Sequence, residues 1–158
     1  MRLGAGRALP LLLLCAGCFG GGATTTAPPS SLAPADADIA AFSARIQTFY
    51  HALEDVPLDS LVTYQNKKLA DCFATQAAFS DYYSALATEA RNLYFRDMTA
   101  RSVRIRHFEF ASPDEAQVEV TFTSVHQRVL RFWSIGFDRY DTWKRSDDGI
   151  WRIVPEKL

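Results

Sequence analysis

The sequence predicts an α+β domain in which three helices pack on one strongly curved, four-stranded antiparallel sheet. Between positions 36 and 93, apolar residues recur at the helical spacing of three and four residues. From position 103 onward they alternate at the strand period of two. No glycine occurs between Gly22 and Gly136, which favours helices over turns in the first half. Helices followed by an antiparallel meander are typical of a sheet covered by helices on one face.

Each of the three expected helices has a candidate N-cap, namely Asp36, Asp59 and Thr75. Val56-Pro57 ends the first helix. The apolar residues expected on the three helices are Ile39, Phe42, Ile46, Phe49 and Leu53 for the first, Leu61, Val62, Leu69 and Phe73 for the second, and Phe79, Tyr82, Tyr83, Leu86, Ala90 and Leu93 for the third.

Four strands are expected at residues 103–110, 117–125, 129–143 and 151–154. Asp147-Asp148-Gly149 predicts a hairpin turn with the glycine in the left-handed conformation. In the first strand, the apolar positions switch face between Ile105 and Phe108, and the third strand switches between positions 132 and 135. Such a switch indicates either two covered faces or a β-bulge, and bulges bend strands.

The expected core combines the inward positions of helices and strands. Cys72 is the one cysteine outside the first eighteen residues. We expect it to be a small buried residue, as free cysteines usually are. The other predicted core residues are Phe42, Ile46, Phe49, Phe79, Tyr83, Leu86, Val118, Val120, Phe122, Trp143 and Ile153.

The first eighteen residues predict where the protein is located in the cell. Arg2 and Arg7 precede a short apolar run at 9–14, which is too short to span a bilayer but has the length of a signal-peptide core. The run ends in Cys15-Ala16-Gly17-Cys18, which resembles the lipobox of bacterial lipoprotein signal peptides. The resemblance implies cleavage before Cys18 and acyl chains on that cysteine. An ordinary cleaved signal peptide is the alternative.

Three segments follow from this interpretation: a signal peptide at 1–17, the lipidated cysteine with a flexible Gly/Thr/Pro tether at 18–35, and one domain at 36–158. Phe19, in place of an Asp after the cysteine, favours the outer membrane facing the periplasm. Removing residues 1–17 removes two arginines and no acidic residue, so the net charge changes from −1 to −3. That balance gives no argument for nucleic-acid binding.

The order of elements and the final segment, Asp141-Thr-Trp143 to Gly149-Ile-Trp151-Arg-Ile153, resemble the nuclear transport factor 2-like superfamily. The resemblance implies a cone with a pocket between helices and sheet. If three residues separate Ser146 from Ile150, Arg145 faces Trp151 and Trp143 faces Ile153. Some relatives are isomerases, cyclases or dehydratases with acid–base residues on an early hairpin. This chain has no room for that hairpin before Ala77, so no catalytic residue is carried over.

Candidate site residues remain. His107 and Glu109 could transfer protons if both point into the cone, although the larger apolar area of Phe108 and Phe110 favours turning them outward. The ligand-binding candidates are Tyr50, Tyr140 and Asp141. A core tyrosine is the alternative for Tyr50, and a solvated strand face is the alternative for the other two. His126 is expected on the surface.

The three histidines lack metal-ligand spacing, and no cofactor motif occurs. The sequence therefore predicts a non-catalytic envelope lipoprotein, held at the membrane by lipid on Cys18, whose cone binds a small apolar ligand or a protein partner. A pocket enzyme that uses His107 or Glu109 is the alternative.

Overall fold

The structure is a computed structural model that describes residues 36–128, 130, 131 and 133–155. The predicted signal peptide, Cys18 and the tether lie outside the described residues. Two long helices, α1 (Asp36–His51) and α4 (Gln76–Asn92), flank two single-turn helices, α2 (Leu61–Tyr64) and α3 (Lys67–Ala70). After the 3-10 helix η1 (Arg96–Met98) come strands β1 (Ser102–Ser112), β2 (Glu115–Val125), β3 (Ser134–Arg145) and β4 (Trp151–Val154).

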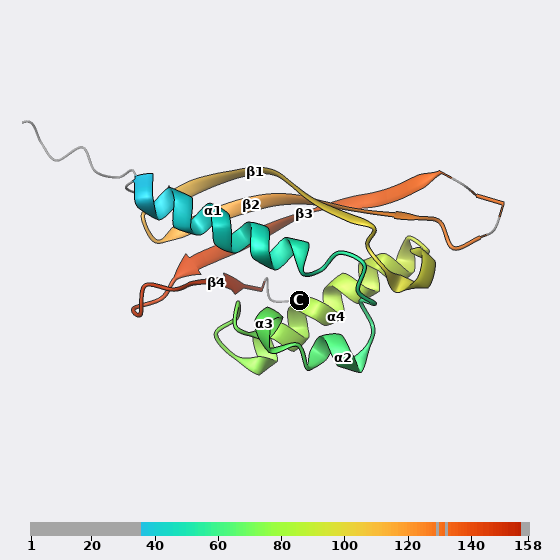
Figure 1. Cartoon of the computed structure of the whole chain (residues 1–158), viewed down its shortest axis with the longest axis horizontal. Coiled ribbons are helices and arrows are strands. Elements are labelled where there is room, and N and C mark those ends of the chain that lie inside the picture. Colours follow the sequence, from blue (N-terminus) through green and yellow to red (C-terminus); the bar gives the residue numbers. More distant parts are fainter. Residues whose placement is uncertain (1–35, 129, 132, 156–158) are drawn as a thin grey trace, which may run out of the picture.

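The four strands form one antiparallel sheet in the order β1-β2-β3-β4, so the predicted α+β class with a four-stranded antiparallel sheet is confirmed. The sheet is curved, and α1 runs alongside its long strands, whereas α4 runs obliquely to them and ends near η1 (Figure 1). The start of α1 and the β2–β3 connection lie at opposite ends of the longest axis of the molecule (Figure 1). Among the helices of the described residues, none is long and apolar enough to span a membrane.

The expected second helix is present only as the two single turns, so the expected count of three helices is not confirmed. Asn66 separates the turns, because its Oδ1 accepts the amide protons of Lys68 and Leu69 and starts a new helix there. The interruption rotates the first turn away from the core. Of the apolar residues expected on the second helix, Leu61 and Val62 are exposed, at 76% and 79%, whereas Leu69 and Phe73 are buried.

The predicted cap of α4 is confirmed, since Thr75 accepts a hydrogen bond from the amide of Ala78 at 3.1 Å. The predicted apolar face of this helix is buried except at Leu93, which is 36% exposed.

β1 contains the bulge that its switch of faces predicts. Ile105 pairs with Val120 but His107 pairs with Glu119, so Arg106 is the extra residue. The third strand has another explanation for its switch, because β3 starts at Ser134, five residues later than expected. Residues 129 and 132 lie outside the described part of the chain.

The β3–β4 hairpin has the predicted register. Trp143 pairs with Ile153 and Arg145 pairs with Trp151, and Gly149 has a φ of 77°. The free edge of β4 is covered by the segment after α3, because the amide of Ile153 donates to the carbonyl of Cys72 at 2.8 Å.

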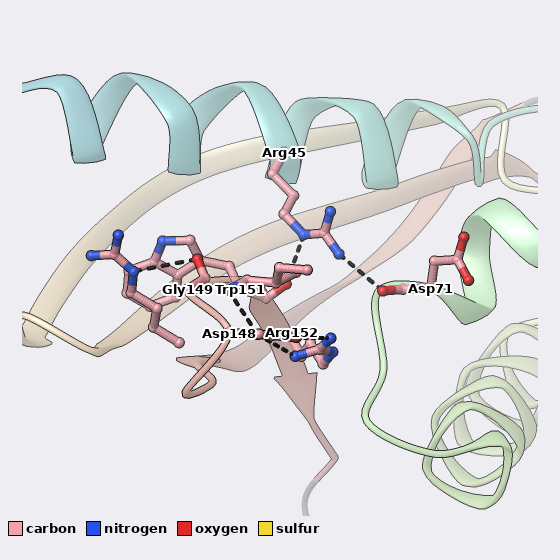
Figure 2. Close-up of polar contacts among 8 residues, drawn as sticks. Arg45, Asp71, Asp148, Gly149, Trp151 and Arg152 are labelled. Carbon is pink, nitrogen blue, oxygen red and sulfur yellow. Dashed lines mark hydrogen bonds and ion pairs between the residues drawn. The ribbon is translucent and has the colours of Figure 1, made fainter.

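Arg45 fixes α1 onto this corner of the fold (Figure 2). Its Nε donates to the carbonyl of Trp151 at 2.6 Å, and its Nη2 donates to the carbonyl of Asp71 at 2.9 Å. Every residue of the predicted core is buried, and so is Cys72. Aromatic rings fill much of the space between the helices and the sheet, among them Phe42, Phe49, Tyr50, Tyr82 and Trp143.

Candidate functional site

The sequence-based catalytic candidates, His107 and Glu109, are exposed on the outer face of the sheet. Their neighbours Phe108 and Phe110 take the inner face and pack against Phe42, with ring centroids 5.5 and 5.2 Å away. The Arg106 bulge makes this possible, because the extra residue exchanges the two faces of the strand. The outward orientation expected from apolar area is therefore confirmed, and the two residues do not converge inside the cone.

Two of the three ligand-binding candidates do converge. The hydroxyl of Tyr50 on α1 donates to Oδ2 of Asp141 on β3 at 2.7 Å, and Asp141 is only 3% exposed. Tyr140 is the next residue along a strand, so its side chain points to the opposite face, where it is 61% exposed. The alternative of a solvated face thus applies to Tyr140 and not to Asp141.

Two further residues complete the site around Asp141. The hydroxyl of Tyr82 on α4 also donates to Oδ2 at 2.8 Å, and Nε of Arg139 donates to Oδ1 at 2.8 Å. The Arg139 guanidinium lies over the Tyr82 ring, 4.5 Å from its centroid, and pairs with Glu89 at 3.5 Å. The buried carboxylate consequently has hydrogen-bond donors on both oxygens, and it joins both long helices to the sheet.

The electrostatics of this Asp141 network favour a fixed structure over acid–base chemistry. Burial, followed by the Asp141 carboxylate, raises the pKa of both Tyr50 and Tyr82 well above the ordinary value, so both phenols remain protonated donors. Burial also raises the pKa of Glu89, which the Arg139 charge partly opposes. Among the described residues, every buried side-chain nitrogen and oxygen has a hydrogen-bond partner. The buried groups of the network are thus engaged with one another.

Three hollows of the described residues open to solvent, and one of them reaches this network at Tyr50. One of about 680 Å³ lies between α2, α3 and the start of α4, with Lys67, Asp71 and Arg152 on its rim. Arg152 is engaged there by both carboxylate oxygens of Asp148, at 2.9 and 2.6 Å (Figure 2). Two smaller hollows of about 310 and 290 Å³ follow the seam between α1 and β1.

A second constellation lies at the β2–β3 connection, the end of the molecule opposite the start of α1 (Figure 1). We call it the aromatic–arginine tip, and it consists of Tyr94, His126, Arg128, Leu130, Arg131 and Trp133. The Tyr94 and His126 rings stack with their centroids 5.5 Å apart, and the centroids of the His126 and Trp133 rings are 6.2 Å apart. The guanidinium of Arg128 lies over Tyr94 at 5.8 Å, and that of Arg131 lies over Trp133 at 5.5 Å.

The expectation for His126 was wrong, because the residue is only 4% exposed. Its turn is folded back onto the segment after α4: the amide of Gln127 donates to the carbonyl of Tyr94 at 2.8 Å, and Phe95 and His126 form a β-bridge. The imidazole is thereby enclosed by the aromatic and arginine side chains of the tip. Burial, then the charges of Arg131 and Arg128, lowers the pKa of His126.

The charge pattern of the sequence contains a signal for the tip. No acidic residue occurs between Glu119 and Asp138, although the segment contains two arginines and several large apolar residues. Within the described residues, none of the ion pairs involves Arg96, Arg128 or Arg131. The tip therefore combines exposed apolar side chains with positive charge that pairs with no carboxylate of the described residues.

Comparison with protein-family models, curated proteins and solved structures finds no match. Within the described part of the chain, no group of three His, Cys, Asp or Glu side chains is placed to hold a metal ion.

Proposed function

We propose that this protein is a non-catalytic lipoprotein of the bacterial envelope, anchored by lipid on Cys18. Its domain, of the nuclear transport factor 2-like type, binds another envelope component through the aromatic–arginine tip. The cone of the resemblance would offer a small apolar ligand its interior, but here aromatic side chains and the Asp141 network occupy that space. The binding surface is then an outer one.

The observation that carries the proposal is the exposure of three large side chains at one end of the molecule. Leu130 is 85% exposed, Trp133 is 56% exposed and Tyr94 is 51% exposed. Isolated exposed apolar residues are ordinary, but a cluster with aromatic and arginine side chains is the composition typical of binding surfaces. An enzyme of the isomerase or cyclase type would need polar groups that converge on a cavity and remain free to react, and His107 and Glu109 face outward.

Photo-crosslinking in cells tests the proposal. A photo-reactive amino acid at position 130 should give specific adducts with envelope material. The matched control is the same amino acid at position 62, which is as exposed but lies on α2. Adducts at position 130 alone are the expected result. Equal adducts at both positions, or none at position 130, would contradict the tip as the binding surface.

A further inference from the structure

The His126 ring has two neighbours that can only donate hydrogen bonds, the Arg128 amide and the Arg131 guanidinium, whereas a neutral imidazole has one acceptor nitrogen. The amide of Arg128 donates to Nδ1 of His126 at 3.0 Å, so the proton of the neutral ring lies on Nε2. That Nε2 lies 3.3 Å from Nη1 of Arg131, and a guanidinium nitrogen can only donate. An oxygen anion placed next to Nε2 and Nη1 would accept from each of them.

Other groups around this pair add positive charge. The guanidinium of Arg96 donates to the carbonyl of His126 at 3.3 Å, and the guanidinium of Arg128 lies over the Tyr94 ring. Guanidinium groups bind phosphate oxygens through two parallel hydrogen bonds, and a fixed, partly desolvated cluster strengthens such contacts. The charge and the donor arrangement of the tip are thus complementary to a phosphate group.

The apolar side chains of the tip project outward. Leu130 lies at the turn that the Arg131 amide closes onto the carbonyl of Arg128 at 2.9 Å, and it is the most exposed large apolar residue described. The turn ends the long β2–β3 arm, so its side chains can insert into a membrane surface (Figure 1). Indole and phenol rings favour the interface between lipid headgroups and acyl chains, where Trp133 and Tyr94 would then lie.

From this geometry we infer that the partner of the tip is the surface of an anionic phospholipid bilayer. A headgroup phosphate binds the Arg131 guanidinium at the edge of the enclosed His126 ring, next to Nε2, and Leu130 and Trp133 enter the acyl boundary. The inference rests on the proposed function, since it names the partner of the same surface. A domain tethered by lipid at one end would gain a second, reversible membrane contact at the other end.

Vesicle co-sedimentation tests the inference with the full chain carrying Cys18→Ala, which removes the lipid anchor. We expect stronger binding to vesicles with equal amounts of phosphatidylglycerol and phosphatidylcholine than to vesicles of phosphatidylcholine alone. Binding should fall when salt is raised from about 0.1 M to about 1 M, because the Debye length shrinks from about 10 to about 3 Å. Residues 1–17 carry two arginines, so their contribution differs between the two kinds of vesicle but is the same in every variant, and the comparison between variants isolates the tip.

In that background, Leu130→Ala with Trp133→Ala, or Arg131→Gln alone, should weaken binding to the anionic vesicles by about tenfold, the equivalent of about 1.4 kcal/mol. Leu61→Ala with Val62→Ala removes exposed apolar side chains elsewhere, and Arg104→Gln removes an exposed arginine from the outer face of β1. Both controls should bind as the parent does. Circular dichroism spectra of all variants establish that each is folded.

Three results would overturn the inference. They are equal binding to neutral and anionic vesicles, tip variants that bind like the controls, and displacement from vesicles by inorganic phosphate or polyaspartate at concentrations that leave a nonspecific basic peptide bound. The last result would identify a free anion or an acidic protein as the partner. In that case adducts at position 130 would still support the proposed binding function, whereas failure of both experiments would exclude the tip altogether.

Discussion

The Tyr50 hydroxyl and Oδ2 of Asp141 lie 2.7 Å apart in the interior, and this contact joins α1 to the middle of the sheet. Tyr82 donates to the same oxygen from α4, so one carboxylate orients both long helices. Trp143 adds a longer contact of 3.4 Å from its indole nitrogen to the Tyr50 hydroxyl. Because buried polar groups specify a unique arrangement only when all are satisfied, this network determines how the helices are placed on the sheet.

Removing the carboxylate charge should destabilise the fold. In Asp141→Asn, Arg139 loses the anion at its Nε and remains largely enclosed, so we expect a loss of about 3 kcal/mol of unfolding free energy. Tyr50→Phe removes one neutral donor and should cost about 1 kcal/mol. Tyr140→Phe, on the exposed face of the same strand, is the control and should stay within about 0.5 kcal/mol.

Chemical denaturation of the three variants measures these differences. A stable Asp141→Asn variant would show that the network is not structural. Its groups would then be available for ligand chemistry, and a pocket enzyme would regain support.

His107→Ala and Glu109→Gln should each change the unfolding free energy by no more than about 0.5 kcal/mol, because both side chains face solvent beside a bulge. They should also leave crosslinking from position 130 unchanged, since they belong to a different surface. Loss of crosslinking in a folded variant would transfer the site from the tip to the outer face of β1.

Much of the fold could be predicted because its signals are local. The Thr75 cap, the helical spacing after it and the Asp-Asp-Gly turn each depend on residues a few positions apart. Asn66 is also a local signal, since its side chain caps α3, yet the apolar residues on either side of it favoured one continuous helix. A side chain that competes for backbone amides outweighed the periodicity at that point.

The sites were less predictable because their residues meet only in three dimensions. A solvated strand face was the sequence-based alternative for Asp141, whereas Asp141 and Arg139 have the strand parity of the buried Trp143. Only the arrival of Tyr82 from α4 and Tyr50 from α1 makes a charged pair on that face stable. The burial of His126 likewise depends on contacts with Tyr94, which is 32 positions earlier in the chain.

Cys18→Ala should release the protein from the membrane fraction if lipid on that residue is the main anchor. Dual or multiple acyl chains hold a protein at a membrane far more strongly than a reversible surface contact does. Fractionation in low and high salt measures the change. Membrane association of the variant that is unchanged in high salt would contradict lipidation at Cys18. A weak association that remains in low salt and disappears in high salt is the expected contribution of the tip.

His126 should make the tip sensitive to pH. Its pKa in the fold is lowered below the value of 6.5 that an unperturbed histidine has, through burial and the charges of Arg131 and Arg128. The unfolded chain therefore binds more protons than the folded one just below pH 6.5. Stability is complete above that pH and decreases as the pH falls through 6.5 toward the lower pKa of the folded state.

NMR titration of the His126 ring, followed together with Trp133 fluorescence, measures this transition. A phosphate group bound next to Nε2 would favour the imidazolium, so anionic vesicles should shift the His126 pKa upward, and neutral vesicles should not. Arg131→Gln removes one of the charges that lower the pKa, and it should raise the pKa of the unbound protein. A midpoint that neither the vesicles nor this variant moves would contradict both the electrostatic origin of the shift and the placement of an anion at His126.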